Sequence, residues 1–141
     1  MLGLCLPYTS NPTYQNAWDY LISTWVPDAI WSLRGPFPAP AYREATPVTT
    51  AADLPISTAQ PLVVVSPVNA RYVPGEIPLS RFVHPPDAIY LFGSDHVHLS
   101  DDDLGGRVPD YLVYIETLGV VEMFSWVAGG IVFYDRKVKI G

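Results

Sequence analysis

The stretch "AIYLFGSDHVHLSDDD", residues 88–103, joins an apolar run to a turn and then to a polar, acidic segment. Its first five residues are apolar at successive positions, which is typical of a strand covered on both faces in a parallel sheet. The runs at 62–65 and 111–115 repeat this pattern. Buried strands separated by helices or loops indicate an α/β fold, with a mostly parallel sheet flanked by helices.

The N-terminal part of the chain adds one β–α–β unit. Residues 1–8 read as a first strand, and Asn11 and Pro12 then supply a capping residue and a proline suited to the first helical turn. Apolar residues recur at helical spacing through 13–25, and a second strand is expected at 29–33.

The segment 34–61 contains six prolines and is predicted to be mostly irregular. Within it we expect a short strand near 47–50 and a helical turn at 51–54. We find no internal repeat and no domain boundary, so residues 1–141 are expected to form one domain.

The last segment, 120–137, has the apolar spacing of an amphipathic helix. Gly129 and Gly130 lie in its middle, and each weakens a helix by about 1 kcal/mol. Small residues in this position predict that the helix packs closely against another element.

Composition limits the classes of partner. The chain has 141 residues, of which 49% are hydrophobic and 16% charged, so it is expected to fold rather than to be disordered. Its net charge of −6 disfavours a protein that grips nucleic acid mainly through phosphates. The two lysines, Lys137 and Lys139, adjoin Arg136, so any site for a polyanion is expected to be local.

The N-terminal sequence MLGLCLPY is too short and lacks the basic flank of a secretion signal, so it is interpreted as a buried strand. A cytoplasmic location and no membrane association are therefore expected. Cys5, the single cysteine, is expected to be a packed thiol rather than a nucleophile.

The turn after the apolar run at 88–92 has two interpretations. Ligands of parallel sheets lie beyond the carboxyl ends of the strands, so Gly93, Ser94 and Asp95 are placed for binding. An ordinary turn that ends a strand explains the same residues.

His96 and His98 could ligate a metal with a nearby aspartate, but His-X-His alone is a weak signal, and His84 is isolated in the sequence. We therefore expect no metal. The triplet 101–103 is expected to start a short helix capped by Ser100, because carboxylates suit a helix N-terminus.

Common catalytic signatures are missing from the sequence. It has no Gly-X-Ser-X-Gly elbow, no phosphate-cradling Gly-X-X-X-X-Gly-Lys loop and no Gly-X-Gly-X-X-Gly loop.

Three segments, taken in order, resemble the motifs of the SpoU/TrmH-like RNA methyltransferases of the SPOUT superfamily. They are "TSNPTYQNAWDYLI" after the first strand, "AIYLFGSDHVHLS", and "VYIETLGVVEMFSWVAGGIVFYDR". The resemblance spans essentially the whole chain and rests on the order and spacing of the segments.

This resemblance implies an α/β fold with a C-terminal trefoil knot, over about residues 88–141, that binds S-adenosylmethionine. In the family the cofactor is held largely by backbone groups of loops that follow three strands. The resemblance therefore favours a cofactor loop over an ordinary turn at Gly93. The cofactor-binding positions that it implies are Val65, Ser66, Leu91, Phe92, Gly93, Ser94, Asp95, Ile115, Thr117, Leu118, Glu122, Met123 and Phe124.

The resemblance also implies catalytic positions. Asn11 opens the first motif, and Tyr20 stands where members that methylate ribose carry an arginine. Arg43 matches an arginine of the middle segment. Other departures are Glu116 in place of a proline, Asp95 in place of a glutamate, and Ser125 without the asparagine of the third motif.

Methyl transfer to a ribose needs the 2′-oxygen oriented and relieved of its proton. Without an arginine at position 20, Arg34 or Arg43 reaches in from another loop, or Asp95 or Glu122 acts as base, or RNA is not the acceptor.

Three functions remain open from the sequence. The first is an S-adenosylmethionine-dependent methyltransferase acting on ribose 2′-hydroxyls of tRNA or rRNA. The second is a knotted protein that retains the fold, and binds the cofactor or a partner, without methylating RNA. The third is a different enzyme on an ordinary α/β sheet, such as a hydrolase or a metal-dependent enzyme.

A homodimer is expected as well. Family members pair through the knot region and the first helix, and large aromatic residues lie on or near the matching segments here. These residues are Trp18, Trp25, Phe124, Trp126 and Phe133.

Overall fold

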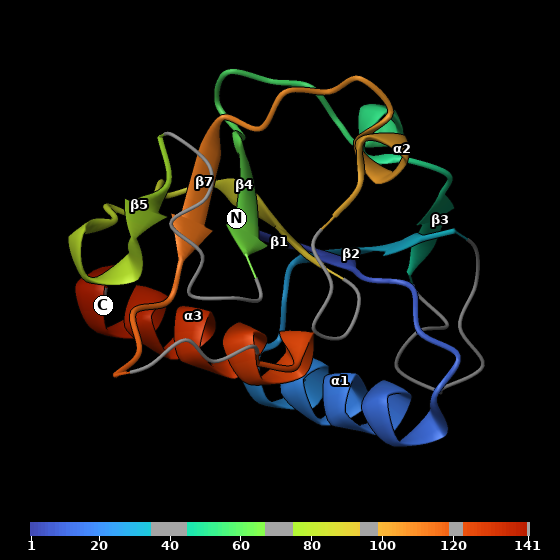
Figure 1. Cartoon of the computed structure of the whole chain (residues 1–141), viewed down its shortest axis with the longest axis horizontal. Helices are drawn as coiled ribbons and strands as arrows, with labels where there is room; N and C mark the ends of the chain where they lie inside the picture. Colours follow the sequence, from blue (N-terminus) through green and yellow to red (C-terminus); the bar gives the residue numbers. More distant parts are fainter. Residues whose placement is uncertain (35–44, 67–74, 94–98, 119–122, 141) are drawn as a thin grey trace.

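A parallel sheet forms the centre of the molecule. The computed structural model describes residues 1–34, 45–66, 75–93, 99–118 and 123–140. Within these ranges seven parallel strands form one sheet in the order β3-β2-β1-β6-β4-β7-β5 (Figure 1). The strands are β1 (Leu2–Leu6), β2 (Ala29–Leu33), β3 (Thr46–Val48), β4 (Leu62–Ser66), β5 (Ile77–Pro78), β6 (Ala88–Phe92) and β7 (Tyr111–Tyr114). The predicted α/β class and parallel sheet are confirmed.

The central strands are buried on both faces, as their continuous apolar sequences predict. In β4 every residue is buried. Val63 and Val65 belong to the core on one side of the sheet, while Leu62 and Val64 belong to the core on the other. This alternation follows from the two-residue period of a strand.

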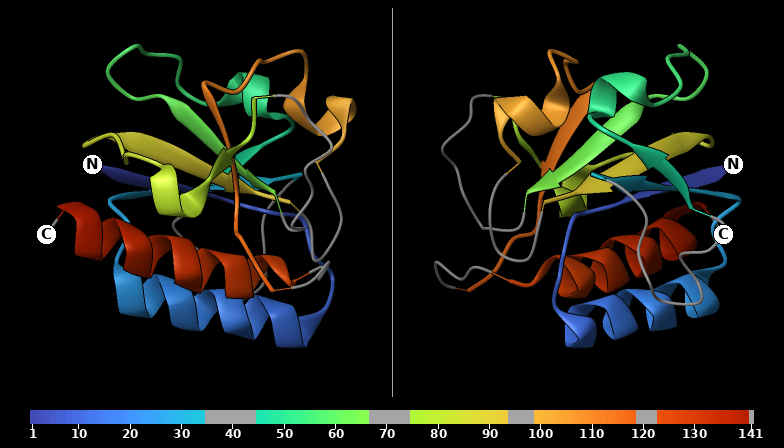
Figure 2. Two further views of the ribbon diagram at one scale, coloured as in Figure 1. Left: turned by 60° about the vertical axis from the view of Figure 1, so that its left-hand side comes forward. Right: turned by 90° about the vertical axis from the view of Figure 1, so that its right-hand side faces the viewer.

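One face of the sheet is covered by α1 (Pro12–Trp25) and α3 (Ser125–Ile140), which lie side by side (Figure 2). The close packing predicted from the mid-helix glycines is confirmed. A Cβ atom added to Gly129 would lie 2.9 Å from the Trp18 ring, so no larger residue fits there without a shift. A Cβ on Gly130 would make only an ordinary contact, 3.5 Å from Leu21.

The opposite face carries short elements, η2 (Ala51–Asp53) and α2 (Asp101–Leu104). The predicted cap of the acidic triplet is confirmed, because the Ser100 hydroxyl accepts a hydrogen bond from the Asp103 backbone N–H in a capping box. Asp103 also forms an ion pair with Arg34. None of the helices in the described ranges is long and apolar enough to cross a membrane.

Some expectations need correction. The last helix begins at Ser125 and continues to Ile140, whereas the periodicity placed it at 120–137. The strand β5 and the turn η3 (Leu79–Arg81) were not predicted, since two- and three-residue elements carry no readable period.

The dimer expectation also relied on residues that are not at the surface. Trp18 and Phe133 are only 1% and 2% exposed and lie in the core, so they cannot supply a docking surface. The knot depends on the paths of residues 94–98 and 119–122, which lie outside the described ranges.

Candidate functional site

Three adjacent strands end at the same edge of the sheet. Val65 in β4 pairs with Phe92 in β6 on one side and with Val113 in β7 on the other. Because the strands are parallel, their carboxyl ends are level, and the residues that follow them lie together. Ser66, Gly93 and Ile115 therefore share one edge, where ligands of open α/β sheets bind.

This carboxyl edge offers few exposed side chains. Val65, Leu91, Phe92 and Ile115 are at most 7% exposed. Among the described residues of this edge, those farther along the third loop reach solvent, and Leu118 is fully exposed. At the described residues a ligand would therefore meet mainly backbone groups, which fits the backbone-held cofactor that the resemblance implies.

The start of α3 completes the site with an aromatic group. The ring centroids of Phe124 and Tyr14 are 5.0 Å apart, and those of Phe124 and Trp126 are 5.9 Å apart in a stacked arrangement. Ser125, the first residue of α3, is 1% exposed, and its hydroxyl has no hydrogen-bond partner among the described residues. Buried hydroxyls normally have a partner, so this one is available to a ligand that reaches the helix start.

The structure describes two of the three proposed catalytic residues, Asn11 and Tyr20. The side chain of Asn11 caps α1 by accepting a hydrogen bond from the Thr13 backbone N–H at 2.9 Å. Tyr20 is 75% exposed and lies nine residues farther along α1, about 13 Å at 1.5 Å per residue. Arg43 lies outside the described residues, as do Ser94, Asp95 and Glu122.

Glu116, which stands in place of the family proline, has a structural partner. Its carboxylate accepts hydrogen bonds from the backbone N–H of Ser80 at 2.9 Å and from the Ser80 hydroxyl at 2.5 Å. These bonds hold the pKa of Glu116 below its usual value. The side chain thus ties the loop after β7 to η3.

The sequence did not predict a buried network of polar side chains around His84. His84 is not isolated: its Nδ1 lies 2.7 Å from the Tyr90 hydroxyl, and its Nε2 lies 2.7 Å from an Asp135 carboxylate oxygen. Lys139 extends this network through an ion pair with Asp135 at 2.9 Å. These residues meet only through the fold, and no spacing in the sequence signals the contact.

Burial and these contacts determine the protonation of His84. Desolvation lowers the pKa of His84, against the opposing effect of Asp135. A neutral ring protonated on Nε2 satisfies both contacts, since it donates to Asp135 and accepts from Tyr90. This network of side chains therefore joins β6, α3 and the segment before β6.

Other chemistry has little support in the described ranges. No group of three His, Cys, Asp or Glu side chains there could hold a metal ion. Cys5 is fully buried, as predicted, and burial raises the pKa of its thiol to about 12.

No family model and no curated protein matches the sequence. Solved structures do match in fold. They include an rRNA methyltransferase from Sinorhizobium meliloti, with a TM-score of 0.71 and 12% identity over 99% of this chain. A TrmH/SpoU tRNA modifying enzyme from A. aeolicus has a TM-score of 0.69 and 10% identity over 98% of this chain. A protein from Porphyromonas gingivalis, assigned to the TrmH family of RNA methyltransferases, has a TM-score of 0.68 and 16% identity over 96% of this chain.

The chain is shorter than these proteins. It spans 56% of the S. meliloti chain, 58% of the P. gingivalis chain and 74% of the A. aeolicus chain. The match covers nearly all of this chain. The apolar strand β6, with which residues 88–103 begin, lies at the centre of the sheet. The chain therefore has the SpoU/TrmH-like fold of these RNA methyltransferases, as the resemblance of its three motifs implies.

Proposed function

We propose that the carboxyl edge formed by β4, β6 and β7 binds S-adenosylmethionine. The observation that carries this proposal is the level register of the three strands, which brings Ser66, Gly93 and Ile115 to one edge next to the start of α3. The likeness to methyltransferase structures supports the same ligand class.

The residues at this edge fit such a cofactor. Backbone groups after the three strands would hold its adenosine part, and the apolar side chains beside them would exclude water. The Ser125 hydroxyl, which has no partner among the described residues, and the N-terminus of α3 would hold the carboxylate, because helix N-termini favour anions. When bound, the cofactor supplies an electrophilic methyl group on a sulfonium.

The proposed acceptor is a ribose 2′-hydroxyl of tRNA or rRNA. The proton of that hydroxyl requires a base or an orienting cation. Arg34 is engaged on the far side of the sheet with Asp103, and Glu116 is engaged with Ser80. We propose Arg43, Asp95 or Glu122 for this role, and these residues lie outside the described ranges.

The second candidate is a cofactor-binding module that does not methylate RNA. It is favoured by the positions of Asn11, whose side chain caps a helix, and of Tyr20, which is exposed far along α1. A net charge of −6 also disfavours tight RNA binding.

Self-association is part of the proposal. We define the outer α3 stripe as Val127, Ile131, Tyr134 and Val138, which recur at helical spacing. The last three are 39%, 63% and 63% exposed. An apolar stripe of this kind marks a contact surface, and we propose that a second copy covers it. A trefoil knot that threads the C-terminal segment would fix α3 in the position where this pairing occurs.

Calorimetric titration tests cofactor binding. Wild-type protein is expected to bind S-adenosylmethionine and S-adenosylhomocysteine, and Gly93→Trp is expected to abolish binding by filling the loop after β6. The matched control is Ile56→Trp, because Ile56 is 78% exposed and lies before β4, at the opposite end of the sheet. Folding of each variant is checked by circular dichroism. A folded wild type that binds neither ligand would contradict the proposal.

Methyl transfer separates the two candidate functions. Radiolabelled S-adenosylmethionine is incubated with bulk RNA, and the digested nucleosides are analysed for 2′-O-methyl products. Label in a 2′-O-methylnucleoside supports the enzyme. Cofactor binding without label in any RNA, over a range of RNA sources, favours the binding module.

A further inference from the structure

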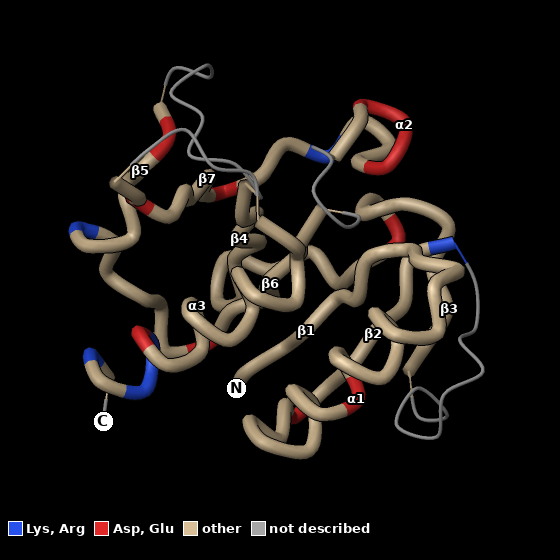
Figure 3. Tube along the Cα trace, turned by 60° about the horizontal axis from the view of Figure 1, so that its bottom comes forward, with Lys and Arg blue, Asp and Glu red and all other residues tan. Residues whose placement is uncertain are grey.

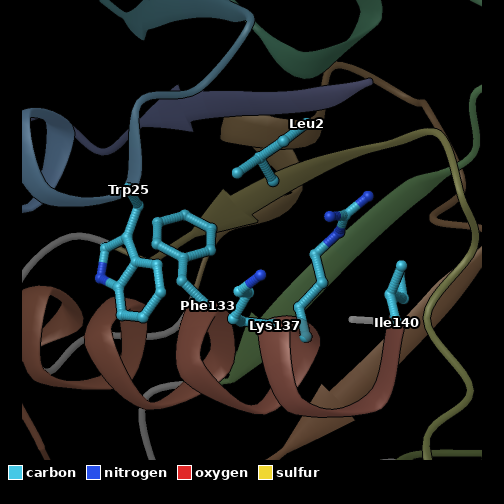
Figure 4. Close-up of a pocket in the computed structure, with 6 residues that line it drawn as sticks. Leu2, Trp25, Phe133, Lys137 and Ile140 are labelled. Carbon is cyan, nitrogen blue, oxygen red and sulfur yellow. The ribbon is translucent and has the colours of Figure 1, made fainter.

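A small cavity lies at the end of the molecule where α1 and α3 finish. Its volume is about 200 Å³ (Figure 4), and it includes Leu2 at the start of β1, so it lies at the end of the sheet opposite the carboxyl edge. The cavity is lined by Leu2, Trp25, Phe133, Arg136, Lys137 and Ile140. The Trp25 and Phe133 rings form an aromatic wall, with centroids 6.4 Å apart and planes inclined by 57°.

Arg136 places a positively charged guanidinium group, fixed by a hydrogen bond, at this cavity. Its Nη2 donates to the Pro86 carbonyl at 2.7 Å, which fixes the guanidinium in place. Its Nε is buried and has no partner within the described ranges. No carboxylate in those ranges forms an ion pair with Arg136, whereas Lys139 is paired with Asp135. A half-buried guanidinium that bonds only neutral acceptors favours an anionic ligand.

The basic residues of the described chain gather at this end. Six of the eight Lys and Arg residues are described. Arg34 bonds Asp103, and Arg107 bonds carbonyls of the η2 region. The other four are Arg81, Arg136, Lys137 and Lys139, and Figure 3 shows them on the side of the molecule that carries β5 and the C-terminal end of α3.

Lys139 explains why these four residues come together. Its ammonium group donates to the carbonyls of Leu79 and Phe82 at 2.5 and 3.0 Å. This contact holds η3, and with it Arg81, against the end of α3. The chain carries a net charge of −6, so this concentration of cations is a local departure from its overall charge.

We propose that this cavity is an RNA subsite, in which Arg136 and Lys137 hold a backbone phosphate and Trp25 stacks on the adjoining base. A guanidinium recognises phosphate by paired hydrogen bonds, and an indole face stacks on any base. At about 200 Å³ the cavity accommodates a phosphate with one ring beside it, not a whole cofactor. The inference rests on the proposed function for the identity of the polyanion.

The distance between the cavity and the carboxyl edge sets the length of RNA that would span both sites. Arg136 lies eleven residues after Ser125 in α3, which separates the two sites by about 16 Å. At about 3.4 Å per stacked nucleotide, this distance corresponds to roughly five nucleotides. RNA held at the cavity can therefore extend to the methyl-transfer site without sharp bending.

Fluorescence anisotropy with labelled bulk tRNA, in the absence of S-adenosylmethionine, tests the subsite. Loss of one phosphate contact is expected to weaken binding roughly fivefold at about 0.1 M salt and to reduce the slope of log K against log salt by about 0.7–0.9. This result is expected for Lys137→Gln, which is exposed, and for Arg136→Gln. Because Arg136 also holds Pro86, its variant is read only together with a thermal unfolding curve.

Two further variants sharpen the test. Trp25→Leu is expected to weaken binding at least about fivefold with an unchanged salt slope, because stacking releases no counterions. Arg34→Gln removes the same charge at the carboxyl end of β2, where Arg34 is paired with Asp103, and is expected to leave affinity nearly unchanged.

The proposal is overturned if Arg34→Gln weakens binding as much as Lys137→Gln, since that would show a general charge effect. It is also overturned if folded wild-type protein fails to bind tRNA at low salt, or if Lys137→Gln binds as wild type does. Failure of methyl transfer alone, with this pattern of RNA binding intact, would contradict the proposed enzyme and leave the subsite standing.

Discussion

The two helices on one face of the sheet, α1 and α3, differ in how they meet solvent. Apart from Tyr20, the outer face of α1 is polar: Thr13, Asn16, Ser23 and Thr24 are exposed, and the last two bond carbonyls of their own helix. The outer α3 stripe is apolar along its whole length. Both helices bury their inner faces in the same core.

The difference between the two outer faces distinguishes what a helix needs for folding from what it needs for association with a second copy. An inner apolar face is sufficient to attach a helix to the sheet, as α1 shows. The second apolar face of α3 adds nothing to the core of one chain, and its exposure is unfavourable in a monomer. The contrast supports the proposed pairing through α3 rather than through α1.

The largest expected effect follows from charging the outer α3 stripe. The double variant Ile131→Asp/Val138→Asp would bury two carboxylates in the pairing surface, so its dimer dissociation constant is expected to rise at least about a hundredfold, which is ~2.7 kcal/mol. Sedimentation velocity over a range of concentrations measures it. The matched control, Asn16→Asp/Ser23→Asp on α1, is expected to leave the dimer intact. A monomeric wild type would remove the basis of the comparison.

The next effect concerns the inner contact between the helices. Gly129→Ala is expected to destabilise the protein by about 1–3 kcal/mol, because the new methyl group meets the buried Trp18 ring. Gly130→Ala, one residue away, meets no such obstacle and is expected to stabilise it by up to about 1 kcal/mol through helix propensity. Urea unfolding of both variants measures the difference. Equal effects would show that helix propensity, not the close approach, decides the outcome.

A smaller effect is expected on the pH dependence of stability, through the contact of His84 with Asp135 of α3. Burial lowers the pKa of His84 in the folded protein, so the unfolded chain binds more protons as the pH falls through about 6.5. Stability is therefore expected to be full above this pH and to fall by at most about 1.4 kcal/mol per pH unit until the lowered pKa is passed. The charged or titratable groups around the ring are Tyr90, Asp135, Arg136 and Lys139.

Urea unfolding between pH 8 and pH 5 checks this dependence, with His84→Gln as the comparison. The variant is expected to be less stable at pH 8 and to lose less stability on acidification. Parallel curves for the two proteins would assign the pH dependence to other groups. Glu116 does not interfere, because its pKa is lowered and its contribution is lost only in more acidic solution.

The smallest effect is expected at Tyr20, the exposed aromatic residue of α1. Tyr20→Ser is expected to change the free energy of unfolding and of self-association by less than about 0.5 kcal/mol, as for most exposed positions. Sedimentation and urea unfolding measure both quantities. A monomeric Tyr20→Ser protein would place α1 in the dimer contact and so weaken the contrast between the two helices.

Much of the fold was predictable, because the strongest signals in the sequence are local. The apolar runs of β4, β6 and β7 and the capping residues Asn11 and Ser100 act through neighbours in the chain. Continuous apolar sequence predicts two-sided burial directly. The position of Gly93 after β6 likewise follows from the strand alone.

The site was less predictable, because its contacts join distant segments. His84 meets Asp135 only when α3 lies against the segment before β6, and Glu116 meets Ser80 only through the pairing of β5 with β7. The interpretation of Trp18 as surface failed for the same reason, since helical spacing does not tell which face another helix will cover.

The ends of the sheet have a further consequence for how copies meet. In the described part of the sheet both edge strands are very short and contain proline: Pro47 in the three residues of β3, and Pro78 in the two residues of β5. Proline offers no backbone N–H, so neither edge is a good template for an added strand. The fold thus resists aggregation through its sheet while one helix stays open to pairing, and concentrated protein should form discrete oligomers rather than fibrils.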